Sequence, residues 1–327
     1  MKKIQKILFG IFLLVFVLFG AAVWQNRGAT SVPYSVLGAK TKAEQSANST
    51  SENLLHVYFL DVGQGDAEFI RTPDGENILI DGGPDNKVLD SLGKVMPFYD
   101  RQIDVMILTH PHADHVTGLV EVLRRYDVKS VYYTAVLQTT PDYLTWLKEI
   151  NDRKIPLFIV KKPFDLQLGD VTLKFLYPTR DLTNARVSNL NNSSIVNELI
   201  YKNEKFLFTG DLEQEGEKEL LAAYQPTPSV ESMKSNNNAT APPLNNILSA
   251  EVLKVGHHGS NTASSEELLK AVEPKIAVIE VGQDNKFGHP HLITLKRLER
   301  FNAEILRTDL MGTIKFDSDG EKVWQEK

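Results

Sequence analysis

Cysteine is the most informative absence from this sequence, since none occurs among its 327 residues. Disulfides and thiolate metal ligands are therefore excluded, and so is a lipid anchor attached to an N-terminal cysteine. A metal ion bound to this chain has to be held by histidine and carboxylate side chains.

An excess of positive charge is absent as well. The chain has 36 Lys and Arg and 42 Asp and Glu side chains, which give a formal charge of −6. Residues 1–52 contain six basic and two acidic side chains, so residues 53–327 contain 30 basic and 40 acidic ones, a formal charge of −10. Such an acidic domain is not expected to capture nucleic acid over a broad surface, although bound metal ions can attract phosphate locally.

The longest apolar run lies at the N-terminus, where residues 7–24 form an unbroken stretch of 18 after three nearby lysines. At about 1.5 Å per residue this run nearly crosses the hydrocarbon core of a bilayer. We expect residues 1–25 to be an uncleaved single-pass anchor in a bacterial membrane, with the remaining chain outside the cell by the positive-inside rule. A cleaved signal segment, and hence a secreted protein, is the alternative, because small residues occupy positions 20–22.

The composition then changes twice along the chain. Residues 26–52 are rich in Ser, Thr, Ala and Asn without hydrophobic periodicity, which is typical of a flexible linker. Residues 53–327 are expected to form one folded domain. Within this domain, residues 225–246 are rich in Pro, Ser and Asn, and we expect a disordered insertion or a mobile surface loop there.

The hydrophobic pattern of the domain alternates between strands and helices. Strands are predicted at 54–60, 67–71, 77–80, 103–108, 130–133, 157–161, 171–177, 195–201, 205–208 and 252–255. Helices are predicted at 116–126, 142–152, 213–223 and 292–301. This order favours an α/β fold of the α+β type, with a two-layered sheet core and helices outside.

Candidate ligands follow the strand at 103–108 directly. The next seven residues read THPHADH, and they contain His110, His112, Asp114 and His115. Neutral imidazole is the commonest metal ligand, and no packing or turn rule requires these residue types at this spacing. The cluster therefore predicts a metal site at the end of a strand, where layered α/β folds gather their ligands.

Further candidates follow other strands. Asp211 comes after the strand at 205–208, and His257 and His258 lie between glycines after the strand at 252–255. His289 belongs to a third histidine-containing loop, so seven of the eight histidines lie in three short loops. Asp81 ends the strand at 77–80 before two glycines, and from the residues alone a simple turn is as good an interpretation as a site-supporting carboxylate.

These motifs together resemble a known family. His110, His112, Asp114 and His115 match the H-x-H-x-D-H signature of the metallo-β-lactamase superfamily. In chain order, FLDVGQGDA, ILIDGG, LTHPHADHVTGL, NNSSIV, FTGDLE, LKVGHHGS and FGHP resemble more narrowly the C-terminal hydrolase domain of ComEC-type DNA-internalisation competence proteins. The similarity extends from about residue 54 to the C-terminus.

The resemblance implies an αββα sandwich, in which two mixed β-sheets flanked by helices hold a centre of two divalent metal ions, zinc first and manganese as the alternative. His110 and His112 would bind the first ion. Asp114 and His115 would bind the second, together with His257 or, as the alternative, His258. Asp211 would bridge the two ions, and Asp81 would support the site.

The sequence departs from the family pattern at the first ion. No histidine occurs from residue 116 to 256, so the extra histidine usual in the superfamily is missing. Asn192 and Ser194 lie in this interval in a segment that resembles the competence subfamily, and we expect them to support the site. A polar turn is the other interpretation of this segment. Full competence permeases have many membrane spans, whereas one is predicted here.

The resemblance also implies hydrolysis by a hydroxide shared between the two ions, with Asp114, Asp211 and His289 as catalytic residues. A phosphodiester such as single-stranded DNA is the favoured substrate. A small ester, a lactone or a β-lactam is the alternative, and a non-catalytic module that holds metal is the second alternative. No protein partner can be inferred from the sequence.

Overall fold

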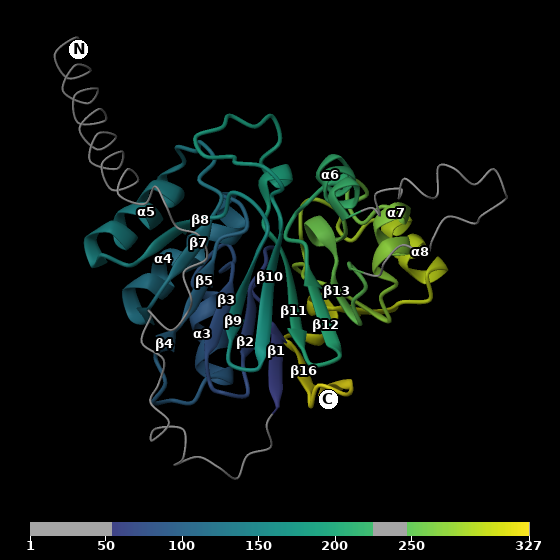
Figure 1. Ribbon diagram of the computed structural model, residues 1–327, viewed down its shortest axis with the longest axis horizontal. Coiled ribbons are helices and arrows are strands. Elements are labelled where there is room, and N and C mark those ends of the chain that lie inside the picture. The colour runs from purple at the N-terminus through teal and green to yellow at the C-terminus, as the bar shows by residue number, and fades with distance from the viewer. Residues whose placement is uncertain (1–53, 225–246, 327) are drawn as a thin grey trace, which may run out of the picture. The chain divides into compact units, whose positions relative to one another are not determined.

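The computed structural model describes residues 54–224 and 247–326 (Figure 1). All of them belong to the second of the two units into which the chain divides, residues 40–327. The predicted membrane anchor, the linker and the predicted insertion at 225–246 lie outside the described residues. Within the described ranges, no helix is both long and apolar enough to cross a membrane.

The first sheet has eight strands in the order β17-β16-β1-β2-β3-β5-β7-β8. Its strands are β1 (Leu55–Phe59), β2 (Glu68–Arg71), β3 (Asn77–Ile80), β5 (Val105–Ile107), β7 (Val131–Tyr133), β8 (Leu157–Ile159), β16 (Ile314–Ser318) and β17 (Val323–Glu326). The pairs from β17 to β3 are antiparallel. The pairs from β3 to β8 are parallel, so the sheet is mixed.

The second sheet has seven strands in the order β15-β14-β13-β12-β11-β10-β9. Its strands are β9 (Phe164–Leu168), β10 (Val171–Tyr177), β11 (Val196–Tyr201), β12 (Glu204–Phe208), β13 (Val252–Lys254), β14 (Ile276–Ile279) and β15 (Glu304–Arg307). Strands β9 to β12 pair antiparallel and β12 to β15 pair parallel, so this sheet is mixed too. A small separate sheet joins β4 (Gln102–Ile103) to β6 (Asp127–Val128).

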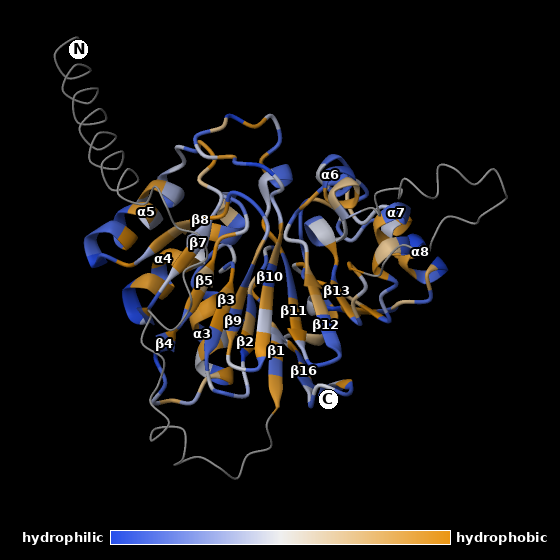
Figure 2. Cartoon of the chain, viewed as in Figure 1, coloured by the Kyte–Doolittle hydropathy of each residue, from blue (hydrophilic) through white to orange (hydrophobic). Residues whose placement is uncertain are grey.

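Helices cover the outer face of each large sheet (Figure 1). The apolar side chains of α3 (Lys87–Val95), α4 (Ala113–Arg125) and α5 (Pro141–Arg153) form one core with the first sheet. Those of α6 (Gln214–Tyr224), α7 (Glu266–Val272) and α8 (Leu292–Arg300) form a second core with the other sheet. Figure 2 accordingly shows orange along many strands, and both orange and blue on the helices.

Aromatic side chains join the two sheets face to face. The ring centroids of Phe59 on β1 and Phe208 on β12 are 5.9 Å apart, and those of Tyr132 on β7 and Phe175 on β10 are 5.3 Å apart. Such contacts bury large apolar surfaces between the sheets. The domain is therefore a helix–sheet–sheet–helix sandwich, which confirms the predicted architecture.

One boundary differs from the prediction in a way that matters for the site. The helix expected at 116–126 begins at Ala113, because His112 has extended backbone and occupies the N-cap position of α4. Asp114 and His115 therefore lie in the first turn of a helix and not in a free loop. A carboxylate at this position is also favoured by the helix dipole.

Candidate metal centre

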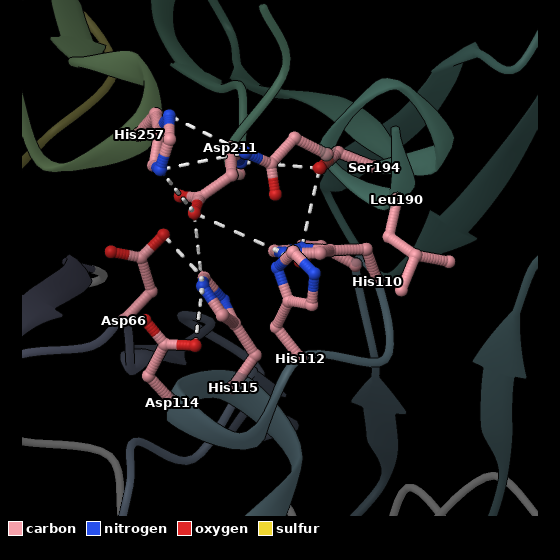
Figure 3. Close-up of polar contacts among 12 residues, drawn as sticks. Asp66, His110, His112, Asp114, His115, Leu190, Ser194, Asp211 and His257 are labelled. Atoms are coloured by element: carbon pink, nitrogen blue, oxygen red, sulfur yellow. Dashed lines mark hydrogen bonds and ion pairs between the residues drawn. The ribbon is translucent and has the colours of Figure 1, made fainter. Parts of the chain in front are cut away.

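The carboxyl ends of three strands bring the predicted ligands together. Strand β5 leads into the THPHADH segment, β12 leads into Asp211, and β13 leads into His257 and His258. Since β5 belongs to the first sheet and the other two strands to the second, the centre lies where the ends of both sheets meet. Figure 3 shows Asp211 between His257 and the histidines of the first cluster.

Two buried histidines point at one carboxylate oxygen. Nε2 of His115 lies 3.4 Å and Nε2 of His258 lies 3.5 Å from Oδ2 of Asp211. Asp114 completes the group, with Oδ2 3.4 Å from Nε2 of His258 and Oδ1 4.0 Å from Nε2 of His115. The group formed by Asp114, His115 and His258 has donor atoms close enough together to hold one metal ion. We call these three residues the braced half of the centre.

Carboxylates and a carbonyl brace these two imidazoles from behind. Nδ1 of His115 lies 2.7 Å from Oδ2 of Asp81, the residue predicted as a support. Nδ1 of His258 lies 2.9 Å from the backbone oxygen of Glu280 and 3.1 Å from Oδ1 of Asp66. An acceptor at Nδ1 fixes the tautomer with the proton there and leaves the Nε2 lone pair for a metal.

A buried lysine lies beneath this bracing. Lys254 is fully buried; its ammonium pairs with the carboxylate of Asp66 and donates a hydrogen bond of 2.8 Å to the backbone oxygen of Gly210. The same ammonium lies 3.7 Å from Oδ1 of Asp211. The Lys254 ammonium thus lies between two carboxylates. One belongs to Asp66, which contacts His258, and the other to Asp211, toward which the site histidines point.

Two further carboxyl groups are buried next to this pair. Glu68 and Glu280 are at most 1% exposed, and with Asp66 they form another group of closely spaced oxygens. Burial, together with the negative charge of Asp66, raises the pKa of Glu280 to about 8, and burial with the charge of Glu280 raises the pKa of Glu68. Since their charged forms are disfavoured here, these two groups are better proton holders than metal ligands.

The first two histidines of the cluster have weaker support from behind, and we call them the open half of the centre. Nε2 of His110 lies 3.9 Å from Oδ2 of Asp211 and 2.9 Å from Nδ1 of His112. Behind His110, Oγ of Thr109 and of Ser194 lie 3.1 Å and 3.4 Å from its Nδ1. His112 is partly exposed and enters none of the groups of potential ligands among the described residues.

Of the two adjacent histidines, it is His258 that faces the braced half. The side chain of His257 is 25% exposed, its Nδ1 lies 2.9 Å from Oε1 of Glu213, and its Nε2 lies 3.9 Å from Asp211. Both histidines have left-handed backbone, with φ of 47° and 53°, and their rings contact different groups. His257 therefore lies at the rim of the centre, although the sequence prediction preferred it.

The remaining predicted residues lie around this rim. His289 is partly buried, and its ring centroid is 5.4 Å from that of His257. Oγ of Ser194 accepts a hydrogen bond of 3.1 Å from the backbone N–H of Asp211. Oδ1 of Asn192 accepts bonds of 3.2 Å from the N–H groups of Glu213 and Gly216. Ser194 and Asn192 thus hold the loop of Asp211 and the start of α6.

Mutual attraction between the buried acids and imidazoles shifts their ionisation strongly. Burial alone would lower the pKa of His258, but Asp211 and Asp66 raise it to about 10. Asp211 and Asp81 likewise outweigh burial and raise the pKa of His115. In return, burial would raise the pKa of Asp211, but these two histidines hold it well below its usual range.

The donor set fits a divalent cation. Nε2 of His115 and Nε2 of His258 are buried without a hydrogen-bond partner, and both lie within 3.5 Å of Oδ2 of Asp211. Buried polar atoms are rarely left unpaired, and such atoms at one point are those that a cation would satisfy. Imidazole and carboxylate together suit zinc and also admit manganese or iron.

A protein-family model described as the metallo-β-lactamase superfamily matches residues 60–282. The chain belongs to this superfamily. The matched range contains all the residues of the braced and open halves and Asp211, whereas His289 lies beyond it.

The chain is also related to competence proteins. ComE operon protein 3 of Bacillus subtilis is 30% identical over 277 residues, which are 80% of this chain and 32% of that protein. Competence protein ComA of Neisseria gonorrhoeae is 26% identical over 294 residues, 89% of this chain and 36% of that protein. The chain thus spans about a third of the length of these relatives. Among solved structures, the metallo hydrolase Igni18 of Ignicoccus hospitalis covers 80% of this chain and 98% of its own, with a TM-score of 0.48 and 14% identity.

Of the residues that brace the centre, the sequence predictions included Asp81 but missed Asp66, Lys254 and Glu280. Asp66 lies in the motif FLDVGQGDA and Lys254 in LKVGHHGS, so both motifs were recognised without a role for these side chains. A charged residue in an otherwise apolar strand, as in VLK of β13, is the signal that could have found Lys254. Glu280 directly follows β14 in the same way that Asp81 directly follows β3.

Proposed function

We propose that this domain is a metal-dependent hydrolase with two divalent ions at Asp211, and that its substrate is a phosphodiester. The observation that carries the proposal is the convergence of two buried, unpaired Nε2 atoms, of His115 and His258, on one oxygen of Asp211. Zinc is the first choice of metal, because imidazole ligands suit it, and manganese is the second, because the carboxylates admit it.

The geometry supports the following assignment. Asp114, His115 and His258 would hold one ion, with His258 taking the place first given to His257. His110 and His112 would hold the other. Asp211, which lies within 3.9 Å of His110, His115 and His258, would be shared.

When bound, such a pair of ions lowers the pKa of water and neutralises charge on phosphoryl oxygens. The side chains of the domain orient the ligands and contact the leaving group. Asp81 and Asp66 keep the imidazoles of His115 and His258 oriented. Burial and the neighbouring histidines lower the pKa of His289 to about 4, so its ring is neutral at physiological pH and can donate a hydrogen bond to a leaving oxygen at the rim.

We further propose that the domain is tethered outside the cell by a segment within residues 1–25 and acts on single-stranded DNA or a similar phosphodiester. The apolar run at 7–24 supports the tether. The relation to competence proteins supports DNA as a substrate. A secreted form remains the alternative if the segment is cleaved.

A second candidate is hydrolysis of a small uncharged ester, lactone or β-lactam. It is favoured by a cavity of about 330 Å³ beside His257, which is lined by amide, hydroxyl and carboxylate groups without a cation. The lining residues are Asn189, Asn192, Glu213, Gln214, Glu215, Asn261 and Thr262. Such a lining suits a neutral, hydrogen-bonding group better than a phosphate.

The test uses the purified full chain in detergent, stripped with a chelator and reloaded with zinc or manganese. We expect cleavage of bis(p-nitrophenyl) phosphate and single-stranded DNA, loss of cleavage on stripping, and an unchanged rate in His56→Ala, whose histidine pairs with Asp317 outside the centre. Cleavage of only a lactone or a β-lactam overturns the substrate. Metal binding without any turnover favours the non-catalytic module.

A further inference from the structure

An exposed aromatic side chain lies next to the centre, on the loop between β14 and α8. Phe287 is 61% exposed. Its ring stacks on His289, with the centroids 5.7 Å apart and the planes at 25°. His289 in turn contacts the ring of His257 at 5.4 Å and that of His258 at 6.4 Å. A row of rings therefore leads from the metal centre out to solvent and ends at Phe287.

A single side chain holds this loop in place. Oδ1 of Asn285 accepts hydrogen bonds from the backbone N–H groups of Phe287 (3.2 Å) and His289 (2.9 Å). Its Nδ2 donates to the backbone oxygens of Gly282 (2.9 Å) and His289 (2.7 Å). Phe287 is thus presented on an organised turn, which reduces the ordering cost of binding a ligand there.

A lysine precedes the aromatic residue. Lys286 is exposed and has no ion pair or hydrogen bond with any of the described residues. Residues 53–327 have a formal charge of −10, and Lys286 places a positive charge beside the exposed ring. An aromatic ring that stacks on bases and a cation that contacts phosphate are the two elements with which proteins bind single-stranded nucleic acid.

We propose that Phe287, backed by His289, stacks on the base of the nucleotide next to the scissile phosphodiester, and that Lys286 contacts a neighbouring phosphate. The substrate class is then single-stranded nucleic acid or a nucleoside phosphodiester, because the bases of a duplex are stacked on each other. This inference rests on the proposed phosphodiesterase function and adds the recognition of the base.

The experiment compares two substrates with the same leaving group, thymidine 5′-(p-nitrophenyl phosphate) and methyl p-nitrophenyl phosphate. In Phe287→Ala we expect kcat/KM to fall between about 5-fold and 100-fold for the thymidine ester, mainly through KM, and to stay within about 2-fold for the methyl ester. Phe287→Trp should retain the preference for the thymidine ester. Phe98→Ala, which removes a ring that is 90% exposed on the loop between α3 and β4, is the matched control and should change neither rate.

Two outcomes overturn the inference while the proposed function stands. An equal loss on both esters means that Phe287 supports the loop and does not bind the base. An unchanged kcat/KM for the thymidine ester means that the exposed ring has another use.

If neither ester is cleaved, the phosphodiesterase proposal itself is contradicted. A binding measurement still tests the stacking of Phe287 on a base in that case. The full chain, reloaded with zinc, is titrated into labelled oligothymidylate and into an abasic strand of equal length. Phe287→Ala should weaken binding of the first strand only, whereas Lys286→Ala should weaken both and reduce the salt dependence by about one charge. Equal binding of the two strands by the unaltered chain overturns the stacking.

Discussion

The two halves of the candidate centre differ in how firmly the chain holds them. In the braced half, His115 and His258 are at most 1% exposed, and each has an acceptor within 3.0 Å of its Nδ1. In the open half, His110 has only hydroxyl oxygens at 3.1 Å and 3.4 Å behind it, and His112 is partly exposed. The superfamily residue that would add a third histidine to the open half is absent from the sequence.

From this difference we infer which half of the centre binds its ion more tightly. Two imidazoles with fixed tautomers and a neighbouring carboxylate bind an ion with little further ordering, whereas two histidines that contact each other leave its shell incomplete. We therefore expect one tightly bound ion in the braced half and one weaker ion in the open half.

The largest effect should come from the carboxylate shared by both halves. Asp211→Asn removes the charge toward which His115 and His258 point, so both ions should be lost at ordinary metal concentrations. We expect activity to fall by more than the roughly 10- to 100-fold typical of outer-shell partners, with the domain still folded. The measurements are metal content after gel filtration, circular dichroism and turnover of bis(p-nitrophenyl) phosphate. Full activity in this variant would sink the assignment of the centre.

The next largest effect should be a difference in the number of metal ions bound when a histidine of one half or of the other is replaced. His258→Ala should remove the tight ion, whereas His112→Ala should keep one ion per chain and still lose turnover. Titration of the stripped protein with zinc against a chromophoric chelator gives both stoichiometries. His257→Ala is the matched control for the neighbouring histidine and should keep the tight ion. If it loses that ion and His258→Ala keeps it, the two histidines have been assigned the wrong way round.

A smaller effect should come from the bracing. Replacing Asp66 by Leu removes the carboxylate that pairs with buried Lys254 and leaves the ammonium with the more distant carboxylate of Asp211, so we expect a loss of roughly 3–5 kcal/mol of stability. The double variant Asp66→Leu with Lys254→Met removes both charges and should recover most of this stability. If Asp66 also orients His258, the affinity for the tight ion stays about 10- to 100-fold lower in the double variant.

The matched control for this cycle is Asp317→Leu, which removes a carboxylate 2.6 Å from Nδ1 of His56, outside the centre. It should leave the zinc affinity unchanged. Recovery of both stability and zinc affinity in the double variant would show that Asp66 serves only to neutralise Lys254.

The sequence predicted the architecture and most of the centre, because both depend on local patterns. The end of an apolar strand is visible in the sequence, because the apolar run stops there. The ligands follow such ends at β5, β12 and β13. The predictions omitted β6, β9 and β14 to β17, together with α3, α7 and α9 (Thr308–Met311). Most of these are short or alternate with polar residues, as in FDLQL of β9, although the apolar IAVI of β14 is strand-like.

What the sequence could not supply is the set of contacts between distant segments. The choice between His257 and His258 depends on the left-handed backbone of both residues, for which the sequence has no signal apart from the flanking glycines. The role of Lys254 depends on Asp66, which is 188 positions away. Such pairs are formed by the packing of the two sheets and not by any local pattern.

The last prediction concerns stability alone and tests the buried acids beneath the braced half. Burial raises the pKa of Glu280 to about 8, so its folded form keeps a proton that the unfolded chain, with an ordinary carboxyl pKa near 4.5, has already released. Below pH 4.5 both forms are protonated and this contribution is fully present; it declines as the pH rises and is lost above about 8. The stripped protein should therefore become less stable across this range.

Glu280→Gln keeps an acceptor for the N–H of Ala67 but cannot ionise, so it should flatten the decline, while the exposed Glu304→Gln should not. Urea unfolding at a series of pH values measures both, and an identical slope in Glu280→Gln would mean that Glu280 is ionised in the folded protein.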